Sequence, residues 1–385
     1  MPAKKAEYSN RHSLTASNRN TTKKQHETPC VKLVAIAKNE GPYIPRWVYH
    51  HLHTGIALIE IHINDTTDNS LKICNNIARQ DKRFKFIQGD RLLRKCKEDG
   101  KNYQTSAYRK SLMNSLRGRD SATHILYLDL DEYLTSRTGN NNINTLINSR
   151  PEADVFSFLW YLEYWNGNRK PFTDPLSNNS AVIRNQHVKS LIKVSRNIRS
   201  CKTHNVQFKK NYSPLNLLSD TGINLVNKEN AHHKRQLISS QLMTKLSTEE
   251  PEGWFIYHAV YRSETEYLAS LIQGTGHTAK QCPIKNNRWG LRNPRGSVLR
   301  LEQTSERMRD RLNYFIFLSK HQLHRELREA KQHLIKRRKK LDRLLKKQPN
   351  IINEYPQAFQ GTTYEDRIQS ISQQQKRTGK ARKAH

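Results

Sequence analysis

The chain has 385 residues, of which 67 are lysine or arginine and 34 aspartate or glutamate, which gives a net charge of +33. Only 35% of the residues are hydrophobic and the mean hydropathy is −0.89, so we expect part of the chain to be solvated tail. No apolar window approaches the roughly 18 residues of a membrane-spanning helix, and the first residues lack the apolar core of a secretory signal, so we expect a soluble, cytoplasmic protein.

Cysteine usage agrees with a reducing compartment. The cysteines form no C-x-x-C pair and have no regular spacing, which predicts free thiols rather than disulfides or a zinc site. They are Cys30, Cys74, Cys96, Cys201 and Cys282.

The first half of the chain alternates between strand-like and helix-like patterns after a basic start. Residues 1–28 carry six basic and two acidic side chains among Ser, Thr and Asn, and we expect them to form a disordered tail. The pattern predicts strands Val31–Ala37, Leu58–Ile63, Phe84–Ile87 and Ile125–Leu130, and helices Tyr43–His53, Ser70–Arg79 and Thr105–Leu116. Strands separated by such helices predict an α/β fold with a mostly parallel sheet.

The second half gives a weaker pattern. We expect strands Val155–Tyr161, Ala181–Arg184, Ser190–Val194 and Trp254–Val260, a helix Thr265–Ile272, and a polar, weakly periodic stretch over 205–250. Residues 299–347 are helical in pattern, and Arg325–Lys347 holds 11 basic against three acidic residues. We expect a main α/β domain over 29–290, large enough to be an enzyme domain, followed by a basic helical extension over 291–347 and a second tail over 348–385.

The run from His124 to Leu134 carries the most distinctive chemistry. An apolar strand ends there in Asp129, Asp131 and Glu132, with the first two on one side of its carboxyl end. Paired carboxylates at the carboxyl edge of a parallel sheet suit a divalent cation that takes its remaining ligands from substrate phosphates. An isolated Asp-x-Asp is also common where a strand ends in a polar loop. The residues at the ends of the other strands are therefore needed to distinguish a cation site from such a loop.

Two upstream strands also end in polar residues. Lys38, Asn39 and Glu40 follow the first strand, and Asn64, Asp65 and Asp68 follow the second. Carboxylates and amides at these ends suit ribose hydroxyls and a base edge. Asp68 has an alternative role as the cap of the next helix.

These ordered motifs resemble the family 2-like glycosyltransferases, over roughly residues 31 to 280. The closest group has a Lys-Asn-Glu start, an Asp-Asn-x-Ser-x-Asp second motif and an Asp-x-Asp-Glu-Phe metal motif. The resemblance implies a GT-A fold, a Rossmann-like nucleotide-sugar half merged with a mixed-sheet acceptor half. It places Lys38, Asn39 and Glu40 in the nucleotide site, and Asn64, Asp65 and Asp68 near the nucleoside, although Asn64-Asp65 reverses the family order. It makes Asp129 and Asp131 the metal motif, for manganese or magnesium, with Asp131 also essential to catalysis.

Downstream residues extend the resemblance. Val188-Lys189-Ser190 followed by His204 resembles a Lys-Ser strand and a later histidine of the family. His258 keeps the family spacing to Ser263, although Ala259 stands where a tyrosine is expected. We expect His258 to be a third metal ligand or a diphosphate partner, or else a histidine at the core edge. Lys189 and Arg262 are candidates for neutralising diphosphate charge.

The expected reaction moves a sugar from a nucleotide-diphospho-sugar donor to a hydroxyl acceptor with inversion. A bound cation stabilises charge on the leaving diphosphate, and a carboxylate takes the acceptor proton. Glu163, in the aromatic segment Trp160–Trp165, is a candidate for that base; the alternative is a structural role. We expect a saccharide or lipid-linked acceptor, as in lipopolysaccharide or polysaccharide synthesis.

The charge leaves other readings open. A polybasic helix at Arg325–Lys347 suits peripheral attachment to an anionic membrane surface, or is simply a solvated helix. Nucleic-acid binding is an alternative function, which the lack of a recognised motif disfavours. A nucleotidyltransferase with a similar fold is a third possible function. The sequence disfavours it, because no Gly-rich phosphate loop follows the first strand.

Overall fold

Alternating strands and helices build the first half of the molecule. In the computed structural model, β1 (Val31–Ala37), β2 (Leu58–Ile63), β3 (Phe84–Gln88) and β4 (His124–Tyr127) pair in parallel in the order β3-β2-β1-β4. Between them lie α1 (Ile44–His53), α2 (Ser70–Gln80), α3 (Asp90–Glu98) and α4 (Tyr103–Leu116). The described residues are 28–136, 142–167, 169–176, 180–209, 215–225, 253–272, 283–285, 287–301 and 305–366.

The sheet continues beyond β4 with mixed strand directions. Its full order is β3-β2-β1-β4-β7-β6-β11-β5, with β10 beside β6 and β12 beside β7. These strands are β5 (Glu132–Ser136), β6 (Val155–Glu163), β7 (Ala181–Lys193), β10 (Leu217–Ser219), β11 (Trp254–His258) and β12 (Val298–Arg300). The short strands β8 (Ile198–Cys201) and β9 (Val206–Phe208) form a separate hairpin, and α5 (Ile143–Ser149) and α7 (Glu264–Leu271) complete the elements of this half. The expected α/β class is therefore confirmed, with a mixed central sheet flanked by helices that is compatible with a Rossmann-like fold.

Three local expectations differ from the structure. The strand expected over 125–130 ends at Tyr127, because residues 129–131 turn and Glu132 begins β5. The strands expected at 181–184 and 190–194 are one strand, β7, since its polar middle is also paired with β6. Helix α3 has no counterpart in the expected pattern because it is short and strongly polar.

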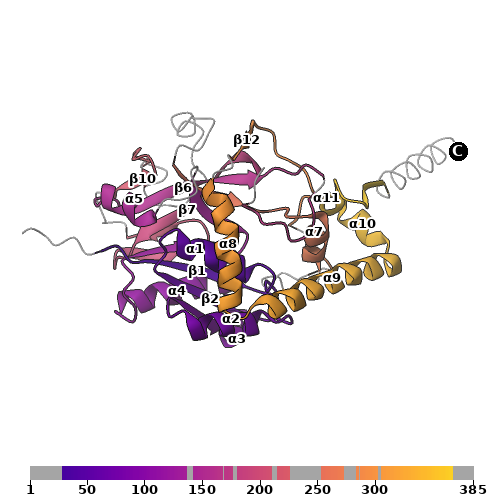
Figure 1. The fold of residues 1–385 in the computed structure, drawn as a ribbon, viewed down its shortest axis with the longest axis horizontal. Coiled ribbons are helices and arrows are strands. Elements are labelled where there is room, and N and C mark those ends of the chain that lie inside the picture. Colours follow the sequence, from indigo (N-terminus) through magenta and orange to yellow (C-terminus); the bar gives the residue numbers. More distant parts are fainter. Residues whose placement is uncertain are drawn as a thin grey trace, which may run out of the picture.

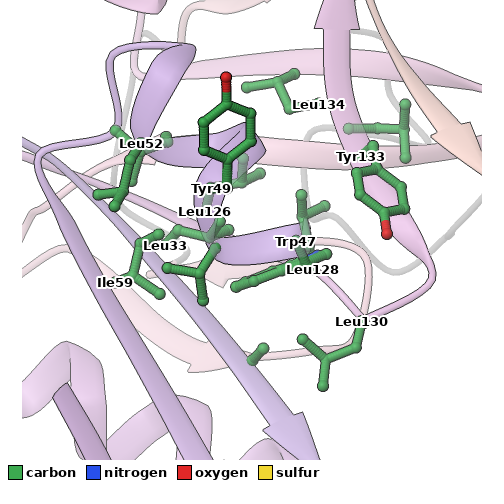
Figure 2. Packing of buried hydrophobic residues seen from close by; sticks show 14 of the residues in the cluster. Leu33, Trp47, Tyr49, Leu52, Ile59, Leu126, Leu128, Leu130, Tyr133 and Leu134 are labelled. Carbon is green, nitrogen blue, oxygen red and sulfur yellow. The ribbon is translucent and has the colours of Figure 1, made fainter. Parts of the chain in front are cut away.

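The main apolar core lies between the sheet and α1. Figure 2 shows Trp47, Tyr49 and Leu52 of α1 against Leu33 of β1, Leu126 of β4 and Leu134 of β5. Side chains of this kind dominate core energetics because each buries a large apolar area. The core therefore fixes the carboxyl ends of β1 and β4 relative to α1, which is where the polar motifs lie.

The C-terminal helices belong to this fold. The main core includes Phe317 and Leu318 of α8 (Ser305–Lys320), Ala330 of α9 (His324–Lys347), and Leu323 between the two helices. Figure 1 shows α8 lying across the sheet and α9 running past α7 toward α10 (Asn350–Glu354) and α11 (Pro356–Phe359). The tail expected from residue 348 is thus corrected for residues 350–359, where Ile351, Ile352 and Phe359 are buried.

Two further expectations can be compared with the described residues. Cys30, Cys74, Cys96 and Cys201 are free thiols, while Cys282 and the tail over 1–27 lie outside the described residues. None of the helices in the described ranges combines the length and apolar character required to cross a bilayer.

Candidate functional site

The turn after β4 is held by its own residues and by α1. The backbone N–H of Glu132 donates to the carbonyl of Asp129 at 3.0 Å, and the Glu132 carboxylate accepts from the Asp129 N–H at 2.8 Å. The indole N–H of Trp47 donates to the Glu132 carbonyl at 2.8 Å. Because three hydrogen bonds fix the turn, Asp129 and Asp131 have defined positions at the carboxyl end of β4.

Lys189 neutralises two carboxylates beneath this turn. Its Nζ lies 2.9 Å from Glu132 Oε2 and 3.3 Å from Asp129 Oδ2, and both Lys189 and Glu132 are fully buried. Burial alone would lower the pKa of Lys189, but Asp129 and Glu132 outweigh it and raise that pKa. Burial raises the pKa of Glu132 to about 7, although Lys189 opposes this shift. Lys189 is therefore a partner of the acidic motif itself, and Gln104 occupies the other oxygen of Asp129 at 3.1 Å.

Asp131 faces His258 across the sheet. Strand β11 pairs antiparallel with β5, and this register brings His258 opposite Glu132. His258 Nε2 lies 3.6 Å from Asp131 Oδ2, and the Nδ1 atom has no hydrogen-bond partner within the described residues. Burial raises the pKa of Asp131, but the effect of His258 and of Arg262 outweighs it and lowers that pKa. The structure thus brings together the two residues expected to share a ligand, from positions 127 residues apart in sequence.

The loops after β1 and β2 are tied together by Asn39. This residue has a positive φ of 55°, and its side-chain Oδ1 accepts hydrogen bonds from the backbone N–H groups of Thr67 and Asp68. Asp68 accepts from the N–H groups of Ser70 and Gly41. Asn39 and Asp68 therefore hold the two loops in register. The N-cap residue of α2 is Asn69 and not Asp68, although Asp68 accepts from the N–H of Ser70, the first residue of that helix.

The remaining upstream residues divide between exposed and enclosed positions. Lys38 forms an ion pair with Asp65, which is more than half exposed, and Asn64 is buried. Glu40 lies 3.5 Å from Arg262, so the first loop reaches the segment after β11. Of this group, Glu40 is the residue that the structure brings toward Asp131, through Arg262.

Arg262 is fixed on three sides. Its guanidinium stacks on the Tyr43 ring at 3.3 Å from the ring centroid and donates to the Leu130 carbonyl at 3.2 Å. Its backbone N–H donates to Glu163 Oε2 at 2.8 Å, which supports a positive φ of 56° at this residue. Arg262 is consequently a preorganised cation beside Asp131.

Glu163 has structural contacts in place of the expected access to an acceptor. Its side chain is buried, pairs with Arg169, and accepts the backbone N–H groups of Tyr261 and Arg262. A carboxylate committed to a cation and two N–H donors is poorly placed to accept a further proton. We therefore assign Glu163 the role of positioning the turn at 261–262. None of the other residues singled out in the sequence replaces it as the candidate base.

Three histidines surround Trp160 beside this site, an arrangement that sequence reasoning missed. The ring centroids of His258, His187 and His204 lie 4.5, 5.0 and 5.0 Å from that of Trp160. The backbone carbonyl of Val188 accepts from His204 Nδ1, so Nε2 carries the lone pair, and burial lowers the pKa of His204 to about 4. Trp160, His187 and His258 come from the adjacent strands β6, β7 and β11, and His204 comes from the turn between β8 and β9, so strand register and the position of this hairpin were the missing signals.

A cavity of about 90 Å³ lies behind Tyr43 and Arg262. Its lining includes Arg46, Tyr133, Glu266 and Lys331, and Arg46 is already paired with Asp174 and Asp310. Asp129 and Asp131 do not line it. The cavity therefore borders the acidic motif without containing it.

The donor atoms at Asp131 fit a divalent ion only in part. Within the part of the chain that the structure describes, no group of three or more His, Cys, Asp or Glu residues is placed to hold a metal. Asp131 and His258 face each other, whereas Gln104 and Lys189 engage the oxygens of Asp129. Two protein ligands suit an ion, such as Mg²⁺, that takes its other ligands from substrate phosphates and water.

Comparisons with known proteins give little beyond this geometry. No family model and no curated protein matches the chain. Among solved structures, HddC from Yersinia pseudotuberculosis is similar at 13% sequence identity over 43% of this chain and 70% of that chain, with a TM-score of 0.22. A likeness at that TM-score carries no argument about function.

Proposed function

We propose that this chain is a glycosyltransferase with a GT-A fold, which moves a sugar from a nucleotide-diphospho-sugar to a hydroxyl acceptor. The observation that carries the proposal is the meeting of Asp131, His258 and Arg262 at the carboxyl end of the parallel strands. Ligands of α/β sheets bind at this edge. A carboxylate, an imidazole and a fixed guanidinium together suit a diphosphate with its cation.

The proposed donor site uses one divalent ion, manganese or magnesium. Asp131 and His258 would hold it, and the ion would stabilise negative charge on the departing diphosphate. Arg262 cannot swing away, because Tyr43 and Leu130 hold its guanidinium. It therefore offers positive charge to the diphosphate without reorganisation.

The acceptor side of the site is proposed to lie over Trp160. The indole is half-buried, and its ring centroid lies 4.5 Å from that of His258. Aromatic faces pack well against the apolar faces of sugars. The His204 ring, whose Nδ1 is bonded to the Val188 carbonyl, belongs to the same cluster. An acceptor on this platform would lie beside His258, which is one of the two proposed ligands of the ion.

We also propose that the acceptor is lipid-linked and that the enzyme works at an anionic membrane surface. Helix α8 exposes Leu312, Phe315 and Ile316, which share one face at helical spacing, with Arg309 and Arg311 nearby. The outer residues of α9 add positive charge. Flotation with phosphatidylglycerol vesicles should be lost for Phe315→Asp, whereas equal flotation of the variant would contradict membrane docking.

Donor binding tests the proposal before any acceptor is known. The melting temperature should rise with at least one nucleotide-diphospho-sugar in the presence of manganese, because a ligand that binds only the folded state stabilises it. UDP- and GDP-sugars form the panel, and a CMP-sugar, which has one phosphate, serves as the comparison. A nucleic-acid-binding protein would instead respond to oligonucleotides alone, and a nucleotidyltransferase to a nucleoside triphosphate together with a sugar phosphate.

A further inference from the structure

The cavity behind Tyr43 and Arg262 is separate from the acidic motif, because neither Asp129 nor Asp131 lines it. It lies where the start of α1, the start of β5, the loop at 172–175 and the start of α7 meet α8 and α9. Its volume of about 90 Å³ is several times the roughly 10–15 Å³ that one enclosed water molecule needs, and it is partly open to solvent. A ligand can therefore enter it from outside.

Tyr133 brings an unpartnered hydroxyl to this cavity. The residue lines the cavity and is only 2% exposed, and its ring is fixed between those of His50 and His51, at 5.5 and 6.0 Å between centroids. The hydroxyl makes no hydrogen bond within the described part of the chain, yet its oxygen remains accessible to water, and the cavity is the space that it reaches. Because buried tyrosine hydroxyls normally have a partner, a ligand in the cavity would supply the missing one.

Glu266 and Lys331 add an acceptor and a donor to the lining. Glu266 Oε2 accepts from the Ser263 hydroxyl at 2.6 Å and from the Phe172 N–H at 3.1 Å, whereas Oε1 accepts from no group among the described residues. Lys331 Nζ lies 5.2 Å from the centroid of the Phe172 ring and forms no ion pair within the same ranges. Together with the Tyr133 hydroxyl, the cavity thus offers one acceptor, one donor and one group that can do both.

The charges of the lining favour a neutral ligand that is rich in hydroxyl groups. They belong to Arg46, Arg262 and Lys331 on one side and to Asp174 and Glu266 on the other. The carboxylates oppose an anion and the basic side chains oppose a cation, because like charges repel strongly where water is excluded. A purely apolar ligand would leave these charged groups desolvated without compensation. Hydroxyl groups satisfy both kinds, since each can donate to a carboxylate and accept from a lysine.

Aromatic rings form much of the remaining lining. Tyr43, Phe172 and Tyr314 line the cavity together with Tyr133. Phe172 has a positive φ of 61°, which a bulky residue rarely adopts, and its N–H bond to Glu266 holds it there. Aromatic rings pack well against the apolar faces of sugar rings. Rings combined with both hydrogen-bond donors and acceptors therefore indicate a carbohydrate.

We propose that this cavity binds one ring of a neutral saccharide, with Tyr133, Glu266 and Lys331 as its hydrogen-bonding partners. One edge of the ring enters the cavity, and the rest of the saccharide extends through the opening. Because neither Asp129 nor Asp131 lines the cavity, this ring is not the one at which transfer occurs. The inference rests on the proposed function for the source of the ring, which is a further sugar unit of the acceptor.

Ligand-observed NMR titration of the full chain tests this site, with the methyl glycosides of glucose, galactose, mannose and N-acetylglucosamine and without nucleotide or divalent ions. At least one glycoside should bind. Tyr133→Phe, which removes only the hydroxyl, and Lys331→Met should each weaken that binding about fivefold, as expected for loss of one hydrogen bond. Lys339→Met is the matched control, because Lys339 is exposed on the same helix and does not line the cavity. Its affinity should equal that of the unmodified chain.

The outcomes separate this site from the proposed function. Failure of every glycoside to bind, or equal affinities for Tyr133→Phe, Lys331→Met and Lys339→Met, would overturn the site. If Tyr133→Phe does not fold, Lys331→Met decides the question. Variants that weaken binding of a nucleotide sugar but of no glycoside would assign the cavity to the donor sugar and contradict the proposal. Glycoside binding that depends on these residues, in a chain that responds to no nucleotide sugar, would contradict the glycosyltransferase but not the saccharide site.

Discussion

At the residue scale, the acidic motif depends on one buried lysine. Lys189 is fully buried between Glu132 and Asp129, and among the described residues no other cation lies within ion-pair distance of Glu132. Removing one partner of a buried ion pair leaves an uncompensated charge, which destabilises far more than the pair itself stabilises. Lys189 is therefore required for the stability of the turn that positions Asp131.

Lys189→Met should lower the free energy of unfolding by about 3 kcal/mol at neutral pH. The folded-state pKa of Glu132, about 7, lies above the ordinary value of about 4.3, so this group favours the folded state at low pH and loses that contribution as pH rises from about 4.3 to 7. Without Lys189 that pKa rises further. In urea unfolding, the loss of unfolding free energy caused by Lys189→Met should thus be smaller at pH 5 than at pH 8.

The matched control is Lys193→Met, an exposed position on the same strand. Its unfolding free energy should change by less than about 0.5 kcal/mol. A Lys189→Met deficit that is the same at pH 5 and pH 8 would show that Glu132 does not carry the uncompensated charge.

Sequence patterns predicted some of these residues and not others. Asp131 and His258 stand out because each ends or follows an apolar strand, and strand order brings them within 3.6 Å. The hydrogen bonds that make Asn39 and Asp68 scaffold residues depend on loop geometry, which periodicity does not encode.

At the element scale, helix α9 is part of the fold rather than a detachable basic extension. Leu341 is fully buried in a cluster with Tyr267, Leu268 and Phe359, which come from α7 and α11. The strands of the first half could be predicted to within a few residues because β1, β2 and β4 are short apolar runs that are buried almost throughout. The contacts of α9 could not, because its many charges conceal a narrow apolar stripe.

Leu341→Ala should destabilise the whole domain by about 3 kcal/mol, since it removes buried methyl groups and leaves a cavity. Unfolding should remain a single transition by circular dichroism and by tryptophan fluorescence. Leu312→Ala, at an exposed position of α8, is the control and should change stability little. Two separate transitions, or an unchanged main transition, would mean that α9 unfolds as an independent appendage.

At the scale of the whole molecule, the cations are proposed to have two roles. Arg262, which is held beside Asp131, is proposed to contact the donor diphosphate, while exposed cations on α8 and α9 are proposed to face an anionic surface. These roles respond differently to salt, because exposed charges are screened within about 10 Å at 0.1 M and enclosed ones much less. Binding of the nucleotide-sugar donor should accordingly weaken less than vesicle binding as ionic strength increases.

Turnover by an Asp131→Asn variant measures whether this carboxylate acts on the departing diphosphate. With a donor from the thermal-shift screen, release of the nucleoside diphosphate should fall at least about 100-fold, because the variant loses a charge that acts on the leaving group. Glu152→Gln, an exposed carboxylate change far from this turn, should retain full turnover, and the thermal melts of both variants should match that of the unmodified chain. Undiminished release by a folded Asp131→Asn chain would contradict the assignment of this site.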